Sequence, residues 1–304
     1  ALFKTYLGSI IDDKVWKGLA EGLNYGFGFM VIFMLHFTVA TKQPAMTAAR
    51  FAEAVEKTPQ GKTVNMKLAQ LLVDVFRSQS IAVLGNVLIA MGLAALIAFS
   101  YQYKTGEPLM NADQIAYQLH SIDPFAGTLW FAAIAGVWLF CSGIISGYFD
   151  NRSNYLNMRM RLTQHPLLKK LMSEKTRVKF ANYMHENYGS LIGNLCFGML
   201  LGITGVVGYL THLPLDIRHV AFSSANVGYI AVSGQFTYSL LLQCIGFVLL
   251  IGLVNLVVSF SLTLWVALRS LNAEIESWWP IWHEVCQIVK KRPLSLFFPV
   301  QLDK

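Results

Sequence analysis

The stretch Leu213–Ala231, LPLDIRHVAFSSANVGYIA, is polar at its centre and lies between two of the most hydrophobic segments of the chain. Residues 190–210 before it are rich in glycine, and residues 236–268 after it carry no formal charge. A membrane interior tolerates so many polar groups only where they face protein or water. We therefore expect either a break in a helical bundle or a functional site at this stretch.

The composition is typical of a membrane protein. Hydrophobic residues make up 55% of the 304 residues, charged residues make up 13%, and the mean hydropathy is +0.48. Soluble domains carry about a quarter charged residues. A helix needs about 20 apolar residues to cross about 30 Å of hydrocarbon, and uncharged runs of this length recur here.

These runs predict an all-α fold, a polytopic transmembrane helical bundle of about five spans with amphipathic cytoplasmic helices. We treat residues 1–304 as a single membrane domain. The predicted spans cover about 22–40, 81–101, 125–145, 190–210 and 236–268. The fourth contains the pairs Gly189/Gly193 and Gly198/Gly202, whose GxxxG spacing lets helix backbones approach closely. We expect this span to lie in the centre of the bundle.

The distribution of basic residues predicts the orientation. Nineteen of the 24 Lys and Arg residues lie in the three segments 41–80, 146–189 and 269–304. Cytoplasmic loops carry the excess of Lys and Arg in multi-pass proteins. These three segments are therefore expected in the cytoplasm, and the N-terminus and Leu213–Ala231 on the outer side.

Two basic regions are expected to contact lipid. Residues 153–188 combine Lys and Arg with apolar residues at helical spacing, and residues 290–292 follow three tryptophans near the C-terminus. Basic amphipathic helices of this kind bind the anionic headgroups of a bilayer. Nucleic acid is the less favoured partner, because no series of aromatic residues or known binding motif accompanies the basic residues.

The polar stretch supplies the candidate binding residues. They are Asp216, Arg218, His219, Ser223, Ser224, Asn226 and Tyr229. In the first interpretation, these groups satisfy the backbone at a re-entrant connection. In the second, Arg218 and His219 attract an anionic substrate, and the Ser and Asn side chains donate hydrogen bonds to it.

A third interpretation is a metal site. The spacing of His212, Asp216 and His219 offers two imidazoles and a carboxylate, a set that can bind zinc if the loop bends suitably. The four cysteines occur singly, without a CxxC pair, so they indicate no further metal site and no disulfide framework. We predict no cofactor.

Five segments of the chain carry a resemblance to a known family. They are HFTVATKQPAMTAA (36–49), GYFDNR (147–152), the glycine pattern of 193–205, LPLDIRHVAFSSANVGY (213–229) and NLVVSFSLTLWVALRS (255–270). In these segments the chain resembles the bacterial membrane proteins known as site-specific recombinases of the Gcr type. Members are about twice as long, so the resemblance implies that the chain corresponds to their C-terminal half. It also implies a multi-pass protein of the bacterial inner (cytoplasmic) membrane and, by the family's name, DNA strand exchange.

The residues do not support recombinase chemistry. Tyrosine recombinases need a tyrosine nucleophile served by arginines, a lysine and a His-x-x-Arg element. None of the seven histidines is followed by arginine three residues later, and the soluble domain of serine recombinases is absent from the sequence. We therefore assign no catalytic residue.

Three classes of function stay open. The favoured prediction is a non-enzymatic protein that transports a small or lipidic solute or scaffolds an envelope complex, with a second copy or an envelope protein as partner. The alternatives are a membrane-tethered DNA-processing protein and an enzyme acting on a lipid or envelope substrate.

Overall fold

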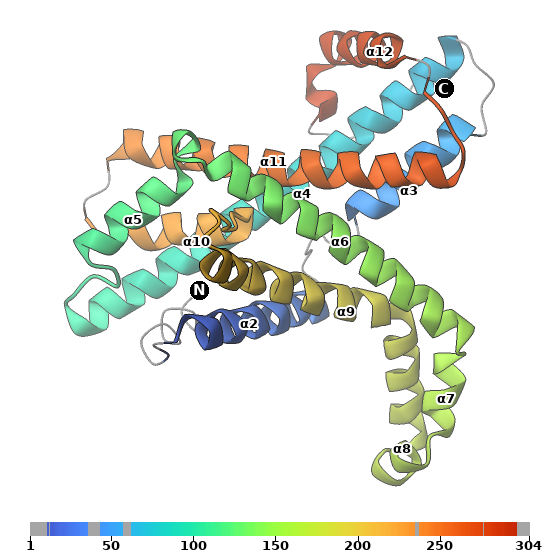
Figure 1. Cartoon of the computed structure of the whole chain (residues 1–304), viewed down its shortest axis with the longest axis horizontal. Helices are drawn as coiled ribbons and strands as arrows, with labels where there is room; N and C mark the ends of the chain where they lie inside the picture. The colour runs from blue at the N-terminus through green and yellow to red at the C-terminus, as the bar shows by residue number, and fades with distance from the viewer. Residues whose placement is uncertain are drawn as a thin grey trace. The chain divides into compact units, whose positions relative to one another are not determined.

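The computed structural model describes residues 11, 13–35, 43–56, 62–234, 237–275 and 277–296, which are mostly helical and contain no strand (Figure 1). The all-α prediction is confirmed. The helices are α2 (Lys14–Met34), α3 (Gln43–Glu56), α4 (Lys62–Thr105), α5 (Ala112–Ile122), α6 (Thr128–Tyr155), α7 (Met158–Gln164), α8 (Pro166–Leu171), α9 (Glu174–Thr211), α10 (Val220–Ala231), α11 (Tyr238–Ser270) and α12 (Trp278–Lys291), with 3-10 turns η1 (Pro124–Ala126) and η2 (Pro293–Leu296).

Four described helices are long and apolar enough to cross a membrane. They are α4 (over Asn65–Thr105), α6, α9 and α11. These helices contain the predicted spans 81–101 and 190–210 and nearly all of 125–145 and 236–268. The chain therefore has the helices of a membrane protein.

The predicted first span, 22–40, is not confirmed. Its described part belongs to α2, which begins at Lys14 and also includes Lys17 and Glu21. Asp13 accepts hydrogen bonds from the N–H groups of Val15 and Trp16 and so fixes this earlier start. Helix α2 is not among the four candidate spans, and residues 36–40 lie outside the described residues.

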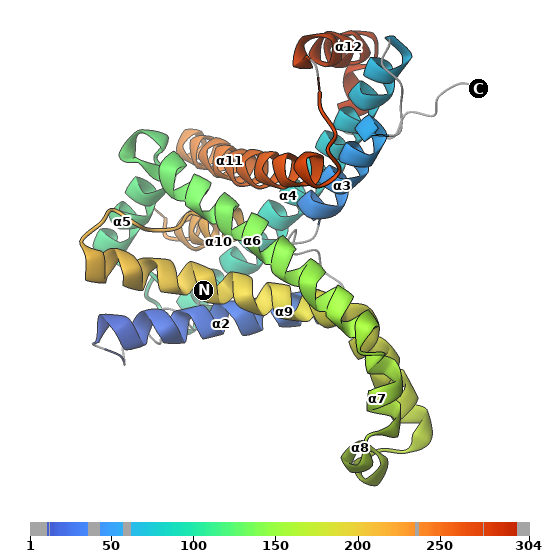
Figure 2. The same ribbon diagram turned by 45° about the vertical axis from the view of Figure 1, so that its right-hand side comes forward.

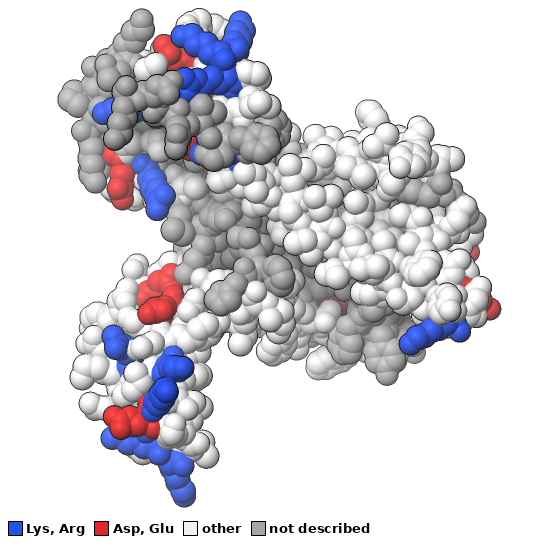
Figure 3. Space-filling model, turned by 180° about the vertical axis from the view of Figure 1, so that it is seen from behind, with Lys and Arg blue, Asp and Glu red and all other residues white. Residues whose placement is uncertain are grey.

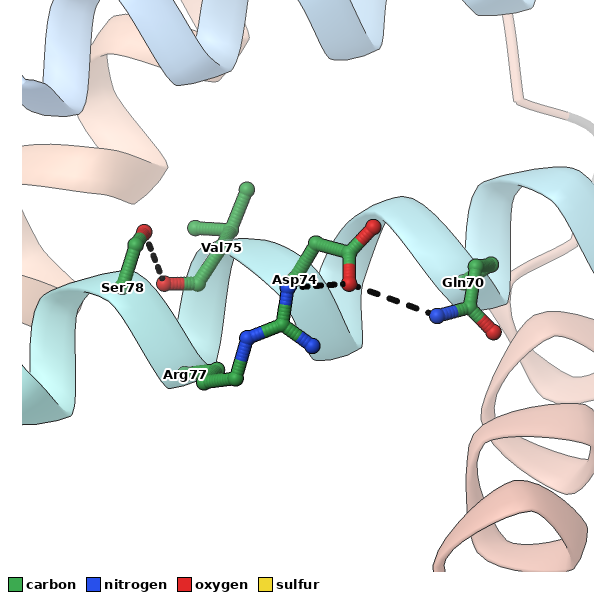
Figure 4. Close-up of polar contacts among 5 residues, drawn as sticks. All are labelled: Gln70, Asp74, Val75, Arg77 and Ser78. Atoms are coloured by element: carbon green, nitrogen blue, oxygen red, sulfur yellow. Dashed lines mark hydrogen bonds and ion pairs between the residues drawn. The ribbon is translucent and has the colours of Figure 1, made fainter. Parts of the chain in front are cut away.

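The second predicted span, 81–101, is only part of a longer helix. Helix α4 runs without a break from the basic segment before this span into the span itself, because no Gly or Pro interrupts residues 62–84. Asp74 binds Arg77 at 2.9 Å and accepts a hydrogen bond from Gln70, both within the helix (Figure 4). After Arg77, α4 carries no formal charge until Lys104, so its apolar part begins beyond this pair.

The chain forms two compact units. Unit 1 comprises Gln43–Val137 and Ile217–Lys304, and unit 2 comprises Leu2–Lys42 and Trp138–Asp216. In unit 1, buried residues of α4, α5, α6, α10 and α11 form one core, and α3, α4, α11 and α12 form another. The core around α10 consists of Val87, Ile122, Ala132, Val220, Val227, Cys244, Val248 and Ile251.

Glycine faces hold unit 2 together, as the GxxxG spacing predicts. A Cβ atom added at Gly198 or Gly202 would overlap the backbone of Gly26 or Gly22 on α2. The other pair faces α6, where a Cβ at Gly189 would overlap the Ser146 carbonyl. Helix α9 therefore lies between α2 and α6, and each GxxxG pair serves a different neighbour (Figures 1 and 2).

The basic region 153–188 is not one helix. It comprises the end of α6, the short helices α7 and α8, and the beginning of α9. His165 precedes Pro166 in extended conformation, which separates α7 from α8. In Figure 3 the Lys and Arg residues of unit 2 gather over this end, whereas much of the visible surface of unit 1 carries no charge.

Candidate functional site

The polar stretch contains a break between helices, which is one of the alternatives that the sequence left open. Residues 213–219 are not helical, and α10 begins at Val220 and ends at Ala231. Twelve helical residues extend about 18 Å, which is too short to cross the hydrocarbon core. Helix α10 packs closely on α4, because Gly228 leaves no room for a Cβ beside Met91 and Ala94.

Asn255, in the middle of the apolar helix α11, forms hydrogen bonds with backbone groups at the helix break. Its side chain is 2% exposed, and its Oδ1 accepts a hydrogen bond of 3.2 Å from the Val220 N–H. Its Nδ2 donates to the carbonyl oxygens of Ala132 on α6, at 2.7 Å, and of Arg218, at 3.0 Å. One carboxamide thus caps the first turn of α10 and joins it to α6 and α11.

Arg218 is held by the protein's own backbone. Its Nε donates to the Ser121 carbonyl at 2.7 Å, and its Nη1 donates to the Ile217 carbonyl at 2.9 Å. The guanidinium carbon lies 5.4 Å from the centre of the Phe131 ring, and the Arg218 N–H donates to the Phe131 carbonyl at 3.2 Å. The guanidinium therefore satisfies one carbonyl oxygen at the end of α5 and one in the segment before α10, and it lies against a ring of α6.

Asn226 and Ser224 also bond within the protein. Asn226 donates from Nδ2 to Oε1 of Gln118 on α5 at 2.7 Å. Ser224 is buried, and its hydroxyl donates to the Val220 carbonyl one turn earlier at 2.6 Å. Gln118 also interacts with Ser121, so one network extends along the end of α5.

The remaining candidates of α10 are buried. Ser223 and Tyr229 are 3% and 6% exposed, and Tyr229 packs with Ala94 and Ala98 of α4. His219 lies outside the four candidate spans and contacts the ring of Phe222 edge-on. Burial lowers the pKa of His219 to about 4, so the imidazole is neutral near pH 7 and does not attract an anion by charge.

The two other residues of the predicted metal set belong to unit 2. His212 is exposed and ends α9 in the left-handed conformation, with φ of 55°, and Asp216 is half-buried. Among the described residues, no group of three or more His, Cys, Asp and Glu side chains could hold a metal ion.

We call the set Gln118, Ser121, Arg218, Ser224, Asn226 and Asn255 the polar junction. Its hydrogen bonds link α5, α6, α10 and α11. Gln118, Ser121 and Asn255 are absent from the sequence-based candidates. Asn255 is nevertheless noticeable in the sequence, because residues 238–268 of α11 carry no charge and a carboxamide among them must find partners within the protein.

Comparison with known proteins identifies the family. A family model described as site-specific recombinase matches residues 1–299, nearly the whole chain. No curated protein and no solved structure shows significant similarity to the chain. The chain, with its four candidate spans and its polar junction, belongs to the site-specific recombinase family.

Proposed function

We propose that this chain is a non-enzymatic scaffold of an envelope complex in the bacterial inner membrane, and that it performs no DNA strand exchange itself. The observation that carries the proposal is the polar junction. Arg218, Asn226 and Ser224, the best candidates for a solute site, bond to groups of the protein itself. These bonds hold helices together, which a scaffold needs, and they favour scaffolding over the transport of an anionic solute.

The orientation follows from each candidate span taken singly. The first turns of α9 carry Lys175, Arg177 and Lys179, whereas Thr211 at its other end precedes an uncharged segment. With 38 residues, α9 extends about 57 Å and exceeds the thickness of the hydrocarbon core. We infer that the basic end faces the cytoplasm and that residues 211–215 face outward.

Single cysteines test this orientation. Leu213 is 55% exposed and Lys170 is exposed, so each can be replaced by cysteine without disturbing the core. The replacements are made in a variant from which the four native cysteines have been removed. In intact cells a membrane-impermeant maleimide should label Leu213→Cys and leave Lys170→Cys unlabelled until the membrane is opened. The reverse pattern would overturn the orientation.

The second candidate function is DNA processing, and one observation favours it. Arg152 donates a hydrogen bond to the hydroxyl of Tyr148 at 3.3 Å, and both residues are exposed at the basic end of unit 2. Tyr155, 87% exposed, lies close by in sequence. A phenol beside a guanidinium is one part of the set of groups that a tyrosine recombinase uses.

Trapping with DNA separates the two functions. A recombinase forms a covalent protein–DNA intermediate, so the purified chain in lipid discs is incubated with labelled duplex and denatured. If the chain is a scaffold, no covalent adduct with DNA should form. Lipid discs formed directly from cells should then contain the chain in an assembly larger than the chain alone. An adduct that is lost in Tyr148→Phe or Tyr155→Phe, but kept in Tyr103→Phe, would establish strand cleavage and refute the proposal.

A further inference from the structure

The segment between α6 and α9, residues 156–173, connects two candidate spans. Helices α6 and α9 are candidate spans that pack antiparallel in unit 2. Trp138 donates to Thr204 at 2.7 Å, and 15 residues further along α6 the Ser153 hydroxyl lies 3.1 Å from Nδ1 of His185. The 18 residues between the spans, which include α7 and α8, therefore lie at one end of this helix pair.

This segment is basic and exposes apolar side chains. It contains Arg159, Arg161, Lys169 and Lys170, all exposed, and no Asp or Glu. Leu167 and Leu171 of α8 are 63% and 76% exposed. They lie four residues apart and so share one face of the helix. Exposed leucines beside lysines are typical of helices that lie in a membrane interface.

A polar contact between α6 and α9 accompanies a bend of α9. The Gly189 N–H donates to Oδ1 of Asp150 at 3.1 Å. The His185 carbonyl, the regular helical acceptor for that N–H, accepts from the Ser153 hydroxyl at 3.3 Å. Side chains inserted into the helical hydrogen bonds bend a helix, and α9 changes direction beside α7 in both views (Figures 1 and 2).

The bend coincides with the start of the apolar run. Residues 190–210 are uncharged, whereas Glu174–Tyr188 are largely polar. As a straight continuation, these 15 residues would hold α8 about 22 Å beyond the apolar run. With the bend, the segment is directed sideways, along the surface of a membrane that α9 crosses.

We propose that residues 156–173 are a docking surface for anionic phospholipid headgroups of the membrane that α6 and α9 cross. The four cations contact phosphate groups, and Leu167 and Leu171 enter the layer beneath them. Duplex DNA would satisfy the cations but offers no apolar layer to the two leucines. The docking is independent of the scaffold role, since a DNA-processing protein would use the same surface in the same way.

A polarity-sensitive dye on Leu171→Cys tests the proposal in the full chain without the native cysteines. The chain is placed in discs of phosphatidylcholine with and without phosphatidylglycerol, and an aqueous quencher is added. Anionic discs should shift the emission to the blue and slow quenching by at least about tenfold. Changing the four cations to Gln should abolish the difference, and Lys104→Gln, at another exposed site, should preserve it.

The bend supplies a second variant. Asp150→Asn keeps an oxygen that accepts the hydrogen bond from the Gly189 N–H, whereas Asp150→Ala does not. In anionic discs, only the alanine variant should therefore lose the protection of the dye from the aqueous quencher. Equal quenching in both disc types would overturn the proposal. A blue shift produced by duplex DNA at physiological salt, and not by anionic discs, would overturn it in favour of nucleic acid.

Discussion

Replacing Asn255 by leucine should destabilise unit 1 strongly. The carboxamide makes three hydrogen bonds, to Val220, Ala132 and Arg218, and all are lost in Asn255→Leu. Hydrogen bonds between helices in membrane proteins contribute about 0.6 kcal/mol on average and up to about 1.7 kcal/mol. The first N–H of α10 is buried and loses its partner, so we expect a loss of about 2–4 kcal/mol in the free energy of unfolding.

Ser259→Ala is the matched control. Ser259 lies one turn further along α11, is fully buried, and its hydroxyl has no hydrogen-bond partner among the described residues. Removing this hydroxyl breaks no bond, so the free energy of unfolding should change by less than about 0.5 kcal/mol.

The assay is unfolding of the purified chain in mixed micelles, followed by tryptophan fluorescence as the fraction of denaturing detergent rises. Hydrogen exchange at the first turn of α10 gives a local readout, and it should be faster in Asn255→Leu alone. If Asn255→Leu unfolds at the same detergent fraction as Ser259→Ala, the hydrogen bonds of Asn255 do not stabilise unit 1, and the role given to the polar junction is refuted.

Two further predictions concern unit 2 and pH. Gly202→Ala should cost about 1–3 kcal/mol, because its Cβ would overlap the backbone of Gly22. A Cβ added at Gly205 would meet no atom within 4 Å, so Gly205→Ala should be neutral or stabilising by up to about 1 kcal/mol. Equal midpoints of thermal unfolding for the two alanine variants would contradict the prediction. Burial lowers the pKa of His219 to about 4 from 6.5, so the unfolded state binds the proton first. Stability should be constant above pH 6.5 and lower by about 2 kcal/mol at pH 5. In His219→Gln this decrease should be absent, and an unchanged pH profile would exclude His219 as its source.

The sequence predicts the parts of the fold that depend on local composition. The later four apolar runs lie in helices long enough to span, and the two GxxxG pairs mark where α9 meets other helices. The limits of α4 were less predictable, because amphipathic and apolar segments join without a residue that stops a helix. The orientation of the site residues depends on Asn255, which lies 35 residues from Val220, and no local pattern shows such a pairing.

The Asp13 cap illustrates the same limit at the first predicted span. Hydropathy favoured a start at Gly22, yet the capping carboxylate begins α2 eight residues earlier and includes charged residues in the helix. For the candidate site, the helix break was predictable from the density of polar residues. Whether these residues face a solute or the protein depends on partners such as Gln118 and Ser121, which lie far away in sequence.

The length of α10 has a consequence for biosynthesis. Because the N–H of Val220 bonds to Asn255, the first turn of α10 has no such partner until the ribosome has made the middle of α11. A twelve-residue helix is also too short to be held in lipid by itself. We therefore expect α10 to fold stably only after α11 has been made, and a chain truncated between Ala231 and Asn255 to be degraded.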